Sequence, residues 1–204
     1  MYLNPIIILV GLTVAISAYA WSNQQLLNNW ILDPYQMNRR GGQWYRFLTS
    51  GFLHADWGHL LFNMITFYSF GGLALAAFSG VLGSQYGLLA FLALYLGGII
   101  VSDLPTYFRH RHDPGYRSLG ASGGVSSVLF AGILFQPTGS IGMMFLPGLE
   151  IPGFIWGGLY LLYSYYMGRR RGDNINHDAH FYGAAYGVVL TAVLLPGILF
   201  GVVQ

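Results

Sequence analysis

Long apolar stretches recur along this chain and limit what it can fold into more than any other feature does. Most of them approach the roughly 20 residues that a membrane-crossing helix needs. Only 8% of the residues are charged, whereas a soluble domain carries about 25%. Such a chain cannot cover a surface that faces water, so we predict an all-α integral membrane protein, a bundle of six transmembrane helices. The predicted spans are residues 5–21, 58–79, 86–103, 122–136, 152–167 and 179–202.

The length and the connections indicate how these spans are organised. A chain of 204 residues suits one domain, which we assign to residues 1–204. The first span lacks a basic start and further spans follow it, so we do not expect a cleaved signal peptide. The long loop at residues 22–57 is rich in Trp, Tyr and Arg, residues that favour the interface between lipid and water. We therefore predict an interfacial loop between the first two spans.

The fourth predicted span is too short to cross the hydrocarbon core. About 15 residues of helix rise about 22 Å, whereas the core is about 30 Å thick. The exit at Gln136 and Pro137 has the composition of an interface turn, so the submerged end is the one that begins at Ser122. Non-helical backbone at that depth persists only where protein surrounds it or water reaches it. We therefore expect Ser122 to face an internal polar cavity.

Ser122 lies within Gly120-Ala121-Ser122-Gly123, a motif short enough to arise from helix packing alone. A serine hydroxyl becomes a nucleophile only when a neighbouring base takes its proton, and His does this near neutral pH. Because the chain has no Cys, thiolate nucleophiles, disulfides and Cys-ligated metals are excluded. The sequence leaves Ser122 open to either interpretation, nucleophile or packing residue.

His180, near the start of the last span, is the candidate base. Its neighbours Ala179, Gly183 and Gly187 recur every four residues, so they share one helix face that another backbone can approach closely. If this face packs against Gly123, His180 comes near Ser122. The alternative is a buried histidine that is hydrogen-bonded for structural reasons.

Two polar residues in the second span are candidate oxyanion donors. His59 and Asn63 lie four residues apart, on one face of a helix. Polar side chains are costly within a membrane, which favours a functional role, and amide hydrolysis needs donors for the developing oxyanion. A structural polar pair that holds helices together is the alternative. His54, just before this span, is expected to brace the long loop.

A metal site is the rival arrangement. Imidazole and carboxylate groups are metal ligands, but no His-Glu-x-x-His motif with a general-base Glu is present. We therefore predict no metal. The candidate ligands would be His54, Asp56, His59, His177, Asp178 and His180.

Together these motifs resemble the rhomboid family of intramembrane serine proteases, in its bacterial form with a six-helix core. The resemblance covers nearly the whole chain. It rests on His59-x-x-x-Asn63 in the second span, Gly120-Ala121-Ser122-Gly123 at the fourth, and Ala179-His180-x-x-Gly183 followed by Gly187 in the sixth.

The resemblance implies a membrane-embedded hydrolase, a serine endopeptidase in which Ser122 is the nucleophile and His180 the general base. It implies an oxyanion hole formed by His59, Asn63 and the backbone N–H of Ser122. Substrates would be membrane helices with small or helix-breaking residues, and the fifth helix and the loop before the sixth would gate their access. Arg46, eight residues before His54, would brace the first loop. Neither a cofactor nor a nucleic acid partner is implied.

The chain departs from the family pattern at two places. The family often has a Tyr four residues after the serine, stacked on the catalytic His, but this chain has Ser126. We expect another aromatic residue, such as Tyr182 or Phe181, to hold His180, or His180 to be held less firmly. A Glu that is common near the end of the second helix is also missing from residues 71–76. These departures motivate the alternative function, a catalytically inactive rhomboid-like membrane binding protein.

The distribution of Arg conflicts with the orientation that the resemblance implies. By the positive-inside rule the loops that hold the nine basic residues should face the cytoplasm, and Ser122 with them. Family topology implies the opposite. We favour family topology, in the cell inner membrane with the active site open to the extracytoplasmic side, because some of these Arg can be interfacial or buried. The nine basic residues are Arg39, Arg40, Arg46, Arg109, Arg111, Arg117, Arg169, Arg170 and Arg171.

Overall fold

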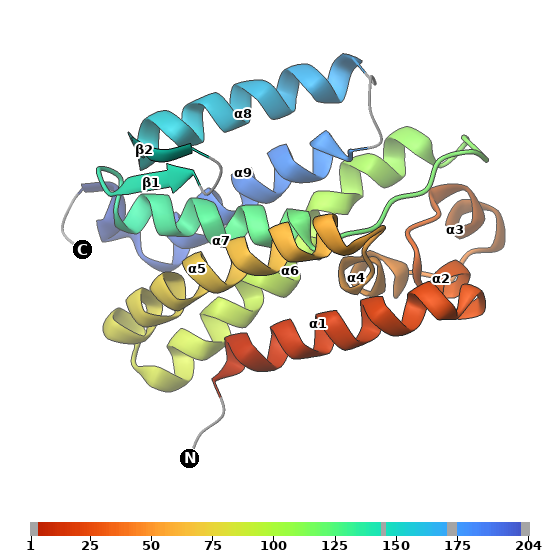
Figure 1. Cartoon of the computed structure of the whole chain (residues 1–204), viewed down its shortest axis with the longest axis horizontal. Coiled ribbons are helices and arrows are strands. Elements are labelled where there is room, and N and C mark those ends of the chain that lie inside the picture. Colours follow the sequence, from red (N-terminus) through yellow and green to blue (C-terminus); the bar gives the residue numbers. More distant parts are fainter. Residues whose placement is uncertain (1–3, 144–145, 171–174, 201–204) are drawn as a thin grey trace.

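The computed structural model describes residues 4–143, 146–170 and 175–200 of the chain, and in these residues helices predominate (Figure 1). The elements, in chain order, are α1 (Pro5–Ser22), α2 (Gln24–Trp30), α3 (Pro34–Arg40), α4 (Arg46–Thr49), the 3₁₀ turn η1 (Ser50–Phe52), α5 (Trp57–Leu82), α6 (Ser84–His110), α7 (Ser122–Phe135), β1 (Ser140–Met143), β2 (Leu146–Pro152), α8 (Gly153–Arg170), α9 (His177–Leu194) and η2 (Pro196–Phe200).

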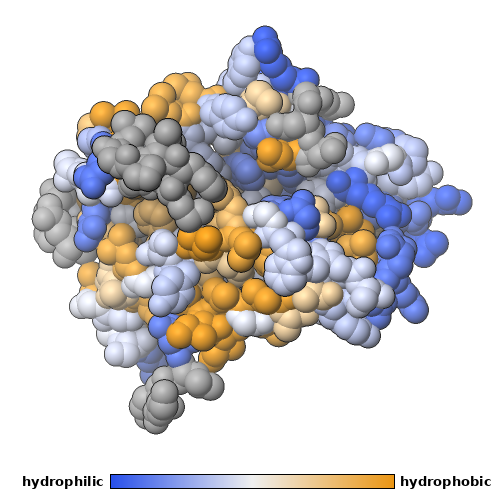
Figure 2. All heavy atoms as spheres, in the orientation of Figure 1, coloured by the Kyte–Doolittle hydropathy of each residue, from blue (hydrophilic) through white to orange (hydrophobic). Residues whose placement is uncertain are grey.

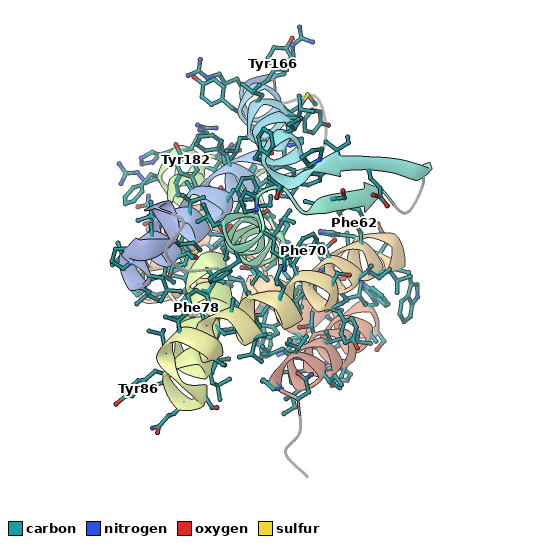
Figure 3. All side chains as sticks on the ribbon, turned by 90° about the vertical axis from the view of Figure 1, so that its left-hand side faces the viewer. Phe62, Phe70, Phe78, Tyr86, Tyr166 and Tyr182 are labelled. Carbon is teal, nitrogen blue, oxygen red and sulfur yellow. The ribbon has the colours of Figure 1, made fainter. Side chains whose placement is uncertain are left out.

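Each of the six predicted spans coincides with a helix. In the described part of the chain, α1, α5 and α6 are long and apolar enough to cross a membrane. The helix at the fourth span, α7, is shorter, with 14 residues. Figure 2 shows hydrophilic residues gathered at the right-hand end of the molecule, around α2 and α3, and hydrophobic residues across much of the remaining face. Exposed aromatic side chains such as Tyr86 and Tyr166 project from the helices (Figure 3).

The bundle is centred on α7, which packs against α5, α6, α8 and α9. Nearly all of its residues are buried. Small residues permit this close packing: a side chain on Gly98 of α6 would overlap the Ser127 hydroxyl and approach Gly124 on α7. Membrane helices associate through such close backbone contacts, because lipid offers no hydrophobic gain for burying apolar side chains.

The long first loop contains short helical segments that we did not predict: α2, α3, α4 and η1. Arg46 is buried within it. Its guanidinium donates to the carbonyl oxygens of Asn28 (2.9 Å) and Ile31 (2.7 Å), and to the Gln43 side-chain oxygen (2.9 Å). These bonds tie the start of α4 to the end of α2, so the loop is a folded unit.

The main differences from the prediction are a hairpin in a predicted loop and the ends of two helices. Residues 137–151, expected to be a loop, include the antiparallel hairpin β1–β2, in which Ile141 pairs with Ile151. Helix α6, at the third predicted span, continues past the expected end at residue 103 to His110 despite Pro105. Its buried face continues through Thr106 and Tyr107. In the last predicted span, residues 179–202, helix α9 ends at Leu194, since Pro196 disfavours helical backbone at the residue before it. Residues 201–202 of this span lie outside the described residues.

Candidate active site

Ser122 begins α7, and His180 lies in the first turn of α9. The two helices run parallel, because Gly183 of α9 lies against Gly123 of α7 and Gly187 lies against Ser127. Added side chains at Gly183 and Gly187 would overlap the backbone of α7. Both helices therefore start at the same end of the bundle, and the seam of small residues lies next to Ser122 and one turn from His180. Both candidate residues are partly buried.

Backbone contacts fix the turn before Ser122. Gly120 has φ +127°, a conformation that residues with a side chain rarely adopt. Its N–H donates to the carbonyl oxygen of Ser50 at 3.0 Å. The next N–H, of Ala121, donates to Nε2 of His54 at 3.4 Å. Because the first N–H groups of a helix have no partner within it, those at the start of α7 can donate hydrogen bonds to an oxygen atom on which negative charge develops.

His54 links this turn to the first loop and α1. Its Nδ1 lies 3.0 Å from the hydroxyl of Ser17, which donates to the carbonyl oxygen of Phe52 at 2.9 Å. Because Ala121 donates to Nε2, the ring proton belongs on Nδ1. Burial, together with the neighbouring His59, lowers the pKa of His54 to about 3. His54 is therefore a neutral link, with no free nitrogen for acid–base chemistry.

His59 and Asn63 lie near the start of α5, where the Asp56 carboxylate caps the helix by accepting from the His59 N–H at 2.8 Å. The His59 ring lies against Gly120, within 3 Å of where a side chain on that glycine would begin. Asn63 is buried, and its amide donates to the His59 carbonyl oxygen at 2.9 Å. His59 thus lies beside the motif that contains Ser122, with Asn63 one turn behind it.

The ring that stacks on His180 comes from α8. The rings of Tyr160 and His180 have centroids 6.0 Å apart and planes inclined by 18°. The Tyr160 hydroxyl forms a 2.7 Å hydrogen bond with the hydroxyl of Ser126. We expected another aromatic residue to hold His180 in place of the family Tyr, and Tyr160 is such a residue. We had named Tyr182 and Phe181 as examples, and those two rings pack against each other. No short-range pattern relates Tyr160 to His180, since only the packing of α8 brings them together.

A buried polar cluster around Asp103 of α6 fixes the start of α9. Asn176 caps α9 by accepting from the Ala179 N–H at 3.1 Å. Its amide nitrogen donates to Ser118 (3.1 Å) and Asp103 (3.5 Å), and Asp103 also accepts from Ser50 at 3.3 Å. Ser50 is the residue whose carbonyl oxygen holds Gly120. One cluster therefore connects the turn before Ser122 with the helix that carries His180, and no sequence motif indicates it.

An ion pair adds a second link to α9. Arg109, at the end of α6, pairs with Asp178 in the first turn of α9 and donates to the carbonyl oxygen of Gly168 on α8 at 3.5 Å. Within the described ranges, no three His, Cys, Asp or Glu residues lie close enough together to hold a metal ion. The rings of His177 and His180 make an edge contact, with centroids 5.7 Å apart.

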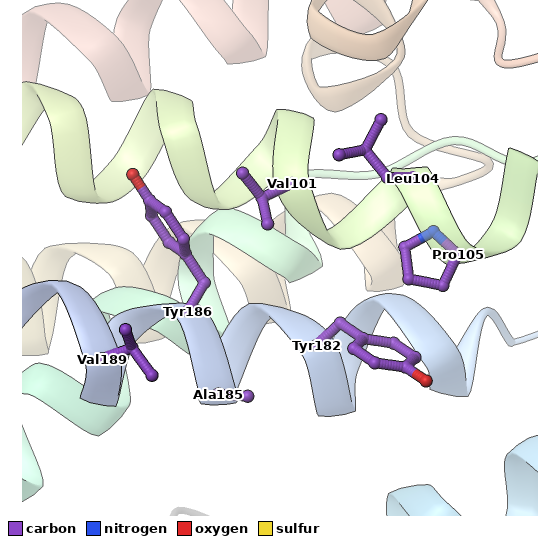
Figure 4. A pocket seen from close by; sticks show the side chains of 7 residues that line it. All are labelled: Val101, Leu104, Pro105, Tyr182, Ala185, Tyr186 and Val189. Carbon is purple, nitrogen blue, oxygen red and sulfur yellow. The ribbon is translucent and has the colours of Figure 1, made fainter.

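A separate apolar hollow of about 360 Å³ lies between α6 and α9. Val101 and Leu104 line it from α6, and Tyr182 and Val189 line it from α9 (Figure 4). Neither Ser122 nor His180 belongs to its lining. The hollow is therefore distinct from the candidate active site.

Comparisons with known proteins support the resemblance to the rhomboid family. A family model described as "Rhomboid domain" matches residues 41–197. The chain is 30% identical over 160 residues to "Putative rhomboid protease YdcA" of Bacillus subtilis (strain 168), which covers 77% of this chain and 70% of that protein. It is 28% identical over 188 residues to "RHOMBOID-like protein 12, mitochondrial" of Arabidopsis thaliana, covering 86% of this chain and 53% of that protein.

A third relative, "Rhomboid-like protein 11, chloroplastic" of Arabidopsis thaliana, is 28% identical over 169 residues, covering 74% of this chain and 52% of that protein. The chain spans about half the length of the two Arabidopsis relatives.

Proposed function

Because the chain belongs to the rhomboid family, we propose that it is an intramembrane serine endopeptidase that cleaves transmembrane-helix substrates. The observation that carries this proposal is the parallel packing of α7 and α9 through Gly123 and Gly183. This packing brings together the ends of the two helices that hold Ser122 and His180.

In the proposed reaction, the Ser122 hydroxyl attacks the carbonyl carbon of the scissile peptide bond. His180 takes the hydroxyl proton and then gives it to the leaving amine nitrogen as the C–N bond breaks. An acyl ester on Ser122 remains. Water then attacks this ester with His180 again as the base, which releases the carboxylate and restores the serine. The dyad needs neither metal nor cofactor.

The oxyanion of each tetrahedral intermediate needs donors already in place. We assign this role to His59, Asn63 and the backbone N–H of Ser122. The contact of His59 with Gly120 supports the assignment. The first N–H groups of a helix, moreover, have no partner within the helix. His54 and Arg46 brace the surrounding loop through their buried hydrogen bonds.

The protein is an integral membrane protein, and its substrates are proposed to reach Ser122 within the bilayer. We propose family topology in a cell inner membrane, with the site open to the extracytoplasmic side. Several Arg side chains are buried or paired within the fold, which supports this orientation. Arg46 is buried, Arg109 pairs with Asp178, and Arg117 pairs with Asp33 at 3.3 Å. Such Arg serve the fold of the loops.

Labelling with a fluorophosphonate probe tests the function directly, since the probe forms a covalent bond only with an activated serine. We expect the purified full-length chain to be labelled. The variants Ser122→Ala and His180→Ala should each abolish both labelling and cleavage of a membrane-helix substrate while the protein remains folded. Cleavage retained by either variant would refute the dyad. A folded wild-type chain that resists the probe would instead favour an inactive rhomboid-like binding protein.

A further inference from the structure

The candidate base is held by a ring that comes from another helix. Tyr160 of α8 stacks on His180, and its hydroxyl hydrogen-bonds to Ser126, one turn along α7 from Ser122. Offset stacking at such centroid distances is attractive and restricts ring rotation. Tyr160 therefore connects the helix of the proposed nucleophile with the helix of the proposed base.

Neighbouring rings hold Tyr160 itself in place. Trp156, one turn earlier on α8, stacks on it with centroids 5.1 Å apart, and Phe130 of α7 packs against it at 5.7 Å. At Gly157 the α8 backbone approaches the Phe130 and Ile133 side chains of α7. The orientation of Tyr160 is thus set by the docking of α8 on α7.

The outer face of α8 contrasts with this inner contact. Phe154, Leu159, Leu162 and Tyr166 are exposed, and the helix lies along the margin of the bundle (Figure 1). The Tyr160 ring lies beside His180, and its hydroxyl contacts the short side chain of Ser126. A displacement of α8 would therefore remove the stacked ring and the hydrogen bond to Ser126 together.

We propose that Tyr160 is a positioning residue that makes the orientation of His180 depend on the docking of α8 against α7. The proposal rests on the proposed function, because it concerns the base of that reaction. With α8 docked, His180 is held for proton transfer from Ser122. With α8 displaced, the imidazole turns more freely and acylation slows.

The first experiment measures fluorophosphonate labelling of full-length variants over a range of probe concentrations, which separates probe affinity from the maximal rate of acylation. Tyr160→Leu should lower the maximal rate about 10–100-fold, because small misplacements of a catalytic group have effects of this size. Probe affinity should stay within about twofold. Tyr166→Leu, a matched change on the exposed face of α8, should label like wild type.

The hydrogen bond has its own test. Tyr160→Phe and Ser126→Ala each remove one partner and should each slow acylation about 2–10-fold. Because they break the same bond, the double variant should be no slower than the slower single variant. If the two substitutions instead lower the acylation rate independently, so that their effects multiply, the proposed link is contradicted. A maximal rate in Tyr160→Leu within about twofold of wild type would also contradict the proposal.

The second experiment does not require activity. In protein labelled with ¹³C-histidine, the ring signals of His180, assigned by their loss in His180→Gln, should shift in Tyr160→Leu and stay unchanged in Tyr166→Leu. Unchanged signals in Tyr160→Leu would overturn the proposal. If the signals shift but wild-type protein never reacts with the probe, the proposed protease function fails while the positioning contact stands.

Discussion

The carbonyl oxygen of Gly123 on α7 occupies the space that a side chain on Gly183 of α9 would need. The atoms that a side chain on Gly183 would meet are backbone atoms of Gly123, which cannot move aside as a flexible side chain could. The close approach of the two helices at this point therefore requires that residue 183 has no side chain.

The first prediction is that Gly183→Ala separates α7 from α9. Overpacking of this kind costs about 1–3 kcal/mol of stability, and the separation moves His180 away from Ser122. We expect a lower melting temperature and a loss of fluorophosphonate labelling of about tenfold or more. Gly72→Ala on α5 is the matched control, because the space beside Gly72 is open. Labelling of Gly183→Ala at the wild-type rate would show that the close contact is not required.

Some of this arrangement could be predicted from the sequence. Long apolar runs identified the segments that became helices, and the spacing of Ala179, Gly183 and Gly187 predicted a face for close approach. These signals are local, because they depend on residues within a few helical turns of one another.

Contacts between distant segments were not predictable in this way. Tyr160 meets His180 only after α8 has docked, and many exposed aromatic residues in α8 look alike in the sequence. The Asn176–Asp103 contact joins residues far apart in the chain and follows no motif. The hairpin β1–β2 was missed because its strands are short and rich in Gly and Pro, and such residues normally indicate a loop.

The second prediction concerns the pH dependence of stability. The pKa of His54 falls from 6.5 to about 3 on folding, so below pH 6.5 the unfolded chain binds a proton that the folded chain does not. The stabilisation is therefore complete above pH 6.5 and is lost as the pH falls toward 3.

The measurement is the melting temperature in detergent between pH 7 and pH 4, for wild type and for His54→Gln. Gln cannot titrate, so the difference between the two proteins isolates His54. We expect the melting temperature of wild type to fall more steeply with acidification than that of the variant. Parallel curves would contradict a neutral, buried His54.

The third prediction concerns the polar cluster at the start of α9. Asn176→Ala removes the helix cap, at a cost of about 1 kcal/mol, and leaves Asp103 and Ser118 without their shared donor. Because Asn176 lies four residues before His180, we expect labelling to fall more than the loss of stability explains. The control is Asn4→Ala, which removes the cap of α1 at the 2.9 Å bond to Ile6. If both variants retain equal labelling, the cluster has no role in the site.

The fourth prediction is the orientation of the chain in a bacterial inner membrane. All nine basic residues lie in or beside the first, third and fifth connections between the predicted spans, on the same side of the membrane as Ser122. By charge alone these connections should remain in the cytoplasm. Arg46, Arg109 and Arg117 are, however, bound by partners within the fold. We therefore expect the opposite orientation, with both termini in the cytoplasm. Green fluorescent protein fused to the C-terminus should fluoresce, and alkaline phosphatase fused at the same point should be inactive. An active phosphatase fusion would mean that the C-terminus is exported and that Ser122 opens to the cytoplasm.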